Sequence, residues 1–131
     1  MANEAVCMIE PTRFGRVTIA AGAVIPKGSL IALTDPNTGA VSSADNDVFG
    51  GIAMEASTAA DTFTEMGVAL DGVWALTATA AAITVGNDVT IGGANTIKAY
   101  TTLDDEKGYV VGKALESTNG SETIMVRLKG Y

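Results

Sequence analysis

The chain carries the same pattern of residues twice. Residues 68–73 (Val-Ala-Leu-Asp-Gly-Val) return 58 positions later as residues 126–131 (Val-Arg-Leu-Lys-Gly-Tyr). Residues 51–57 return 61 positions later as residues 112–118, and residues 25–31 have a fainter echo in residues 83–89. Three matched blocks in the same order exceed what a bias toward Ala and Gly would produce. We therefore expect two similar halves, roughly residues 17–75 and 78–131.

Short strand-forming segments alternate with turn signals throughout these halves. The clearest turns are at residues 35–39 (Asp-Pro-Asn-Thr-Gly), 92–95 (Gly-Gly-Ala-Asn) and 119–120 (Asn-Gly). Pro presets φ for a turn, whereas Gly and Asn accept the left-handed conformation that closes a hairpin. Strands spaced by roughly eight to twelve residues are typical of a barrel or a sandwich. The sequence predicts an all-β protein, with a small single-domain β-barrel or clip-like fold built from two similar halves.

Two local interpretations follow from these turns. The turn at residues 35–39 predicts a hairpin in which Leu33 and Val41 face each other. Asp71-Gly72 is a favoured hairpin dipeptide, but the second copy has Lys129-Gly130 at this place. A bulge, with Gly72 letting one strand bend and continue through Trp74, is therefore the alternative.

The first fifteen residues have no clear period, and Pro11 interrupts them. We expect residues 1–15 to form an extended, loose N-terminal arm on a single β-domain of residues 16–131. Cys7 is the only cysteine, so an intrachain disulfide is impossible, and without any His to act as a base it is expected to be a small hydrophobic side chain.

Charge and hydropathy exclude several classes of partner. The formal net charge is −7, with only eight Lys and Arg residues and no His. Nucleic-acid binding relies on neutralising phosphates, and attraction to anionic membranes also requires basic residues. No apolar run approaches the roughly 20 residues of a membrane-spanning helix. The N-terminus lacks the basic and apolar regions of a secretory signal, so we expect synthesis in the cytoplasm, with no nucleic-acid or membrane partner.

The core is expected to be thin, because much of the apolar content is Ala and only seven residues are aromatic. Burial stabilises by roughly 25 cal/mol per Å² of apolar area, and Ala has little area to bury. Such a domain would gain stability from association. The candidates for the core or for a subunit interface are the single Trp and the matched strand residues: Trp74, Val68, Leu70, Val126 and Leu128.

No arrangement of residues indicates catalysis. The acidic clusters at residues 45–47 and 104–106 lack the alternating oxygen ligands and distant Glu of a calcium loop. The Gly-rich residues 92–95 precede neither a phosphate-binding Lys nor a predicted helix. We therefore predict that the protein is not an enzyme and that it has no cofactor and no metal site.

Several segments resemble those of a known family. Residues 67–76 are similar to the G-x-x-x-x-G-V-W-x-L strand of tailed-phage capsid cement (head decoration) proteins. Residues 85–91 resemble the next strand of that family, and residues 112–116 and 123–128 resemble its closing pair of strands. The resemblance implies a virion protein on the outer surface of a phage capsid, at three-fold or quasi-three-fold positions and often trimeric. It also implies that the major capsid protein is the partner and that capsomer contacts are stabilised.

The arm is the expected contact with such a shell. Arg13 and Arg16 are candidates for pairing with shell carboxylates, and Phe14 lies between them. An alternative function is carbohydrate binding on a particle or cell surface, because residues 23–31 resemble the I-P-K-G-x-x-I hairpin of sugar-binding clip-like domains. That function would require clustered exposed aromatic rings, whereas the seven aromatic residues are dispersed.

Overall fold

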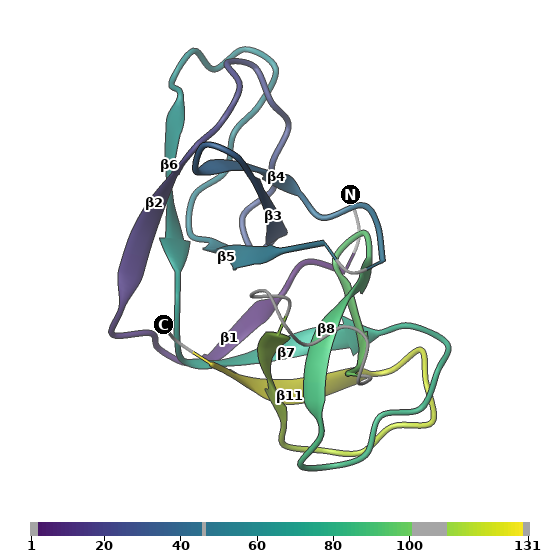
Figure 1. The fold of residues 1–131 in the computed structure, drawn as a ribbon. Helices are drawn as coiled ribbons and strands as arrows, with labels where there is room; N and C mark the ends of the chain where they lie inside the picture. The colour runs from purple at the N-terminus through teal and green to yellow at the C-terminus, as the bar shows by residue number, and fades with distance from the viewer. Residues whose placement is uncertain (1–2, 46, 101–109, 130–131) are drawn as a thin grey trace.

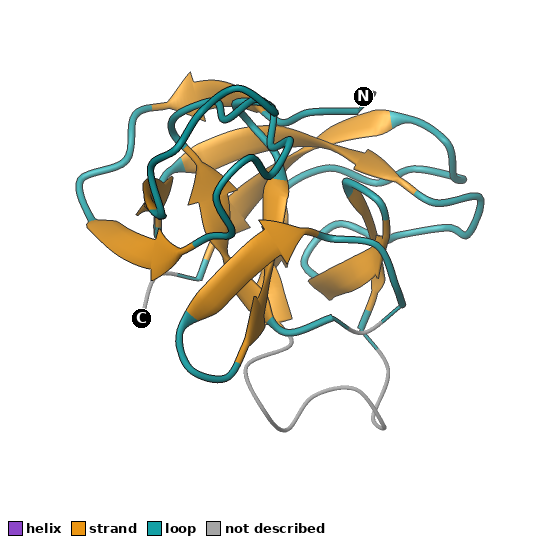
Figure 2. Ribbon diagram, turned by 90° about the horizontal axis from the view of Figure 1, so that it is seen from above, coloured by secondary structure: helices purple, strands orange, loops and turns teal. Residues whose placement is uncertain are grey.

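The computed structural model describes residues 3–45, 47–100 and 110–129, and in these residues it contains strands and loops but no helix (Figure 2). Strand β1 (Val6–Ile9) belongs to the arm. The first half holds β2 (Phe14–Thr18), β3 (Leu30–Thr34), β4 (Thr38–Val41), β5 (Phe49–Ala53) and β6 (Glu65–Ala69). The second half holds β7 (Val73–Ala78), β8 (Asp88–Gly93), β9 (Thr96–Ala99), β10 (Val110–Ala114) and β11 (Thr123–Leu128).

The two halves fold into two barrels with the same strand order. In the first barrel the strands close in the order β2-β4-β3-β5-β6. In the second, the order β7-β9-β8-β10-β11 closes in the same way, and the β7–β9 pair is parallel like β2–β4. Figure 1 shows the first barrel above the second. The expected all-β fold of two similar halves with an extended arm is confirmed.

Side chains repeat along with the strands. The Glu55 carboxylate accepts a hydrogen bond from Gly67 N at 2.8 Å, and the Glu116 carboxylate accepts one from Met125 N at 2.8 Å. Isolated bridges join Ile25 to Ser57 in the first half and Ile83 to Thr118 in the second. Each glutamate ties the loop after one strand to the next strand, so the matched blocks in the sequence correspond to matched contacts.

The turn at residues 35–39 forms the β3–β4 hairpin, but its register differs from the expected one. Thr34 pairs with Thr38, so Leu33 lies opposite Gly39 and Val41 lies opposite Ile31. The prediction that Leu33 faces Val41 is wrong, because the loop contains only three residues, with Asn37 in the left-handed region at φ 44°.

Asp71-Gly72 forms neither a hairpin nor a bulge within one strand. β6 pairs with β5 and β2, whereas β7 pairs with β1, β9 and β11. The dipeptide instead carries the chain from the first barrel into the second.

The arm is extended but not loose. β1 runs antiparallel to β7, with Val6 opposite Ala75 and Cys7 opposite Trp74, so it adds a strand to the second barrel. Ala5 N also donates a hydrogen bond to Gly28 O at 2.8 Å in the first barrel. The expectation of a loose terminus fails because the arm finds a strand edge on its own chain.

The two barrels share part of their apolar core. Leu30, Ile52 and Ala69 of the first barrel belong to the cluster that fills the second. Within the same region Asn95 Oδ1 accepts a buried hydrogen bond from Leu30 N at 2.9 Å. The barrels therefore pack as one unit, although each has its own closed set of strands.

Candidate interaction surface on the N-terminal arm

The arm exposes a set of apolar side chains that a monomer would ordinarily bury. Val6 is 60% exposed, Met8 54% and Ile9 62%, and Phe14 at the start of β2 is 60% exposed. We call these four residues the arm surface. β1 pairs with β7 on one side and, among the described strands, with nothing on the other. Apolar residues gathered at a strand edge are typical of a surface that another chain covers.

A groove of about 570 Å³ runs beside this strand. Its apolar lining comes from the arm, from β2 and from both barrels, and Glu10 and Lys27 add one charge of each sign. The apolar members are Ala5, Val6, Cys7, Pro11, Phe14, Met54 and Trp74. Of these, Trp74 is only 4% exposed, so it forms the floor of the groove.

The carboxylate of Asp71 holds the far end of the arm in place. Its Oδ1 accepts hydrogen bonds from Thr12 N at 2.7 Å and Arg13 N at 3.0 Å, and its Oδ2 accepts one from Thr12 Oγ1 at 2.8 Å. These donors, with Arg13 N foremost, lower the pKa of Asp71 below its ordinary value of 3.8. Leu70 N also donates to Arg13 O at 3.0 Å, so two contacts tie the arm to the linker between the barrels.

Gly72 is required beside this clamp. Its φ of +97° lies in the left-handed region, and a Cβ here would lie 2.7 Å from Ile9 O. The indole Nε1 of Trp74 donates to Asp71 O at 3.0 Å. The linker thus passes close under the arm, and its backbone conformation suits only a glycine.

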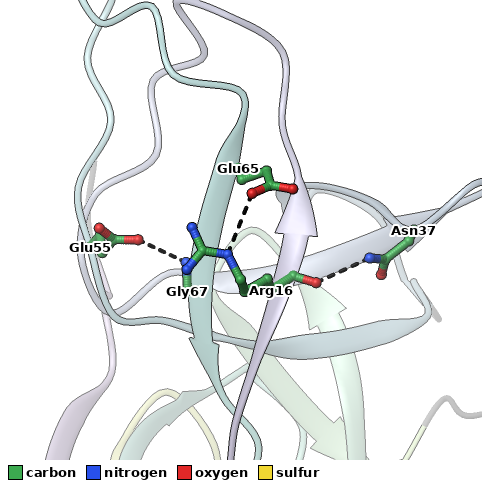
Figure 3. A network of polar contacts seen from close by, with 5 residues as sticks. All are labelled: Arg16, Asn37, Glu55, Glu65 and Gly67. Carbon is green, nitrogen blue, oxygen red and sulfur yellow. Dashed lines mark hydrogen bonds and ion pairs between the residues drawn. The ribbon is translucent and has the colours of Figure 1, made fainter.

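The structure separates the three residues predicted to contact a shell. Phe14 lines the groove, and Arg13 lies in the clamp. Arg16 does not line the groove: its Nε lies 3.5 Å from Glu65 Oε1, and its backbone O accepts a hydrogen bond from Asn37 Nδ2 (Figure 3). Both side chains of the Arg16–Glu65 pair are about two-thirds exposed.

Of the five candidates for the core or a subunit interface, four are buried within a single chain and Leu70 is partly buried. Val68 lies in the core of the first barrel with Leu70 packed against it, and Trp74, Val126 and Leu128 lie in the shared core. The arm strand itself was missed by sequence reasoning. Its only signal was a run of five apolar residues, 5–9, between Glu4 and Glu10.

The part of the chain that the structure describes contains no candidate metal site and no membrane-spanning helix. In residues 3–45, 47–100 and 110–129 no group of three or more His, Cys, Asp or Glu residues could hold a metal ion. No helix there is long and apolar enough to cross a membrane. The acidic cluster at residues 104–106 lies outside the described residues, whereas Asp47 accepts hydrogen bonds from Ser43 N and Ala44 N within its loop.

The fold defines the class of this protein: two closed five-stranded barrels in tandem, with an arm strand added to the second. No family model matches the chain, and no curated protein matches it in sequence. A solved structure with a similar fold is the head fiber gp8.5 N base of bacteriophage phi29. The TM-score is 0.55 at 18% sequence identity, and the match covers 89% of this chain and 95% of that chain. A phage head protein therefore has this fold.

Proposed function

We propose that this chain is a structural protein of a phage head that binds the outside of the shell as a cement or decoration protein. The observation that supports this most is the similarity of fold to a phage head fiber base over nearly the whole of both chains. In the proposal the protein occupies three-fold or quasi-three-fold positions as a homotrimer, and it stabilises the contacts between neighbouring capsomers. Its partner is the major capsid protein, and it has no enzymatic activity.

The arm surface is the contact that this function needs. β1 has an open strand edge, and an extended segment of another protein can add itself to such an edge through backbone hydrogen bonds. The exposed Val6, Met8 and Phe14 side chains supply apolar area beside that edge. The clamp at Asp71 presents the strand in a fixed conformation, so binding requires less ordering of the arm.

Binding to shells tests the proposal directly. Purified shells that lack this protein are mixed with the wild-type chain or with a Val6→Asp, Met8→Asp double variant, and bound protein is measured by co-sedimentation. We expect the number of wild-type chains bound per shell to be close to the number needed to fill the three-fold and quasi-three-fold positions. The double variant is expected to lose binding because it places two carboxylates on the apolar contact.

Val85→Asp is the matched control, because Val85 is 55% exposed but lies in the loop between β7 and β8 and does not line the arm groove. It should bind like the wild type. Failure of the wild type to bind any shell of its own phage would refute the proposed function. Unchanged binding by the double variant would instead remove the arm surface as the contact.

The carbohydrate-binding alternative gains no support from an observation on the described residues. Sugar-binding platforms use exposed aromatic rings, and Trp74, the largest ring, is buried beneath the arm. A measured affinity for a glycan would bring this alternative forward.

A further inference from the structure

The contact between the two barrels has a defined geometry. In the first barrel Leu30, Ile52 and Ala69 lie directly opposite one another across β3, β5 and β6. All three are buried and belong to the core that is shared with the second barrel. We call this line of side chains the docking row.

The docking row is met by the docking turn of the second barrel, residues 93–95, which comprises the last residue of β8 and the two residues that precede β9. Asn95 Oδ1 accepts the hydrogen bond from Leu30 N at 2.9 Å, and Asn95 N donates to Ser42 Oγ at 2.9 Å. Ser42 Oγ donates in turn to Gly93 O at 2.9 Å. A row on one barrel thus receives a turn from the next.

Because the halves repeat, each barrel has both a row and a turn at the matched positions. The row of the second barrel and the turn of the first barrel take no part in this contact between the barrels, and we call them the unused row and the unused turn. The second barrel has a row at Asp88, Lys113 and Arg127, which also lie opposite one another across β8, β10 and β11. The first barrel has a turn at residues 35–37, between β3 and β4, and all three residues are exposed. Asn37 matches Asn95, 58 positions later, and both have positive φ, 44° and 53°.

The unused row has two basic residues and one acidic residue, so an acidic partner would complement its charge. Lys113 and Arg127 are direct cross-strand neighbours, and like charges in that relation destabilise a sheet. Asp88 lies 3.6 Å from Lys113 Nζ, but in the described part of the chain no carboxylate pairs with Arg127. These residues border a shallow pocket of about 240 Å³ together with Leu128 and Lys129.

The unused turn supplies the complementary charge. Asp35 stands where the docking turn of the second barrel has Gly93, so the free turn is acidic at the point that would approach the basic row. The position that matches Ser42 in the second barrel holds Tyr100, whose hydroxyl is at the end of a much longer side chain and is not equivalent to Ser42 Oγ. Ionic contacts would therefore replace the buried serine bridge.

We propose that two copies of this chain associate head to tail, with the turn at residues 35–37 of one copy seated on the Asp88, Lys113 and Arg127 row of the next. This contact repeats between chains the one that joins the barrels within a chain. It is heterologous, so it generates a closed ring if the rotation closes and an open chain of copies if it does not. It does not depend on the presence of a shell.

Sedimentation velocity over a concentration series tests this with the protein alone. We expect the wild type to associate, and we expect Asp35→Lys, or Lys113→Glu with Arg127→Glu, to raise the dissociation constant by about tenfold or more. Combining all three substitutions in one chain reverses both surfaces and should restore association. High salt should weaken the wild-type contact, because exposed charge pairs are screened.

Lys27→Glu is the control for self-association, since it makes the same change of charge on an exposed lysine outside the row and the turn. Lys27 lines the arm groove, so this variant is used only for self-association and not for shell binding. Far-ultraviolet circular dichroism verifies that each variant is folded. A wild type that stays monomeric at every concentration would overturn the proposal. The charged side chains of the row would then prevent a further barrel from docking there. Association that the row variants leave intact, or that Lys27→Glu removes equally, would overturn it too. Shell binding by the arm variants is measured separately, so the two proposals fail independently.

Discussion

Asp71 shows how one side chain can position a whole segment. It sits in the linker between the barrels, and its carboxylate collects three hydrogen bonds from Thr12 and Arg13, some 58 to 59 residues earlier in the chain. A carboxylate that accepts backbone N–H donors is favoured in its charged form. The docking of the arm is therefore coupled to the ionisation of a single residue.

The clamp predicts a pH dependence of arm docking. Because the pKa of Asp71 is lowered in the folded state, its contribution is complete above about 3.8 and is lost as the pH falls through the lowered folded value. The protection factors of the amides of residues 6–9, which are exchange rates corrected for their intrinsic pH dependence, should fall below that pH in the wild type. Asp71→Asn should have low protection already at neutral pH and should lose little more on acidification.

Asp61→Asn is the matched control for the clamp. Asp61 also accepts hydrogen bonds through a carboxylate, from Thr58 N and Thr58 Oγ1, but this contact is local to its own loop. Exchange of the arm should be unaffected by that change. Equal acceleration in both variants would show that the arm responds to overall stability and not to the clamp.

At the level of strands, the repeat preserves one close approach in each barrel. Gly51 and Gly112 occupy matched positions, and a Cβ on either one would collide with the backbone of the neighbouring strand, at Ala69 O and Arg127 O respectively. Backbone cannot move aside as a flexible side chain can. These glycines therefore allow β5 to approach β6, and β10 to approach β11.

Gly112→Ala should destabilise the fold by about 1–3 kcal/mol, because overpacking forces backbone shifts. Urea unfolding followed by tryptophan fluorescence of Trp74 measures this. Gly67→Ala is the control, since a Cβ there meets only Glu55 Oε2 at 3.5 Å and the matched position in the second barrel is Met125. Its cost should stay below about 0.5 kcal/mol. Similar losses in both variants would contradict the close approach as the cause.

At the level of the whole molecule, the barrels are joined by apolar packing with a buried polar contact inside it. Asn95 and Ser42 are each about 1% exposed, and Leu30 N has Asn95 Oδ1 as its acceptor. Removing one partner of a buried hydrogen bond leaves the other without water or protein to replace it. The junction is therefore sensitive to a change in a single amide.

Asn95→Ala should cost about 1–3 kcal/mol in the free energy of unfolding, because Leu30 N would be buried without an acceptor. Asn37→Ala makes the same substitution at the matched turn, with similar positive φ, but in solvent. Water can replace the lost contacts of Asn37, so its loss should be clearly smaller. Chemical denaturation of both variants provides the comparison, and equal losses would refute the role of the buried contact.

Much of the architecture could be read from the order of residues. Matched blocks 58 and 61 positions apart predicted two similar halves, and the Pro, Asn and Gly turns predicted strands joined by short loops. These features are local or periodic: a turn residue restricts its own φ, and a repeated block repeats its own contacts. The pairing of Lys113 with Arg127, in contrast, is apparent only from the register of β10 and β11 in the structure.

Only the tertiary structure decided whether the N-terminal arm docks and which of the two matched turns is buried. Residues 6–9 have no period that distinguishes a docked strand from a loose arm, and only the open edge of β7 and the carboxylate of Asp71 settle the matter. Likewise, Asn95 and Asn37 both occupy hairpin turns with positive φ, yet one is buried against Leu30 and the other is exposed. Both outcomes depend on contacts between residues about 60 positions apart, which the closed barrels create and a linear pattern does not encode.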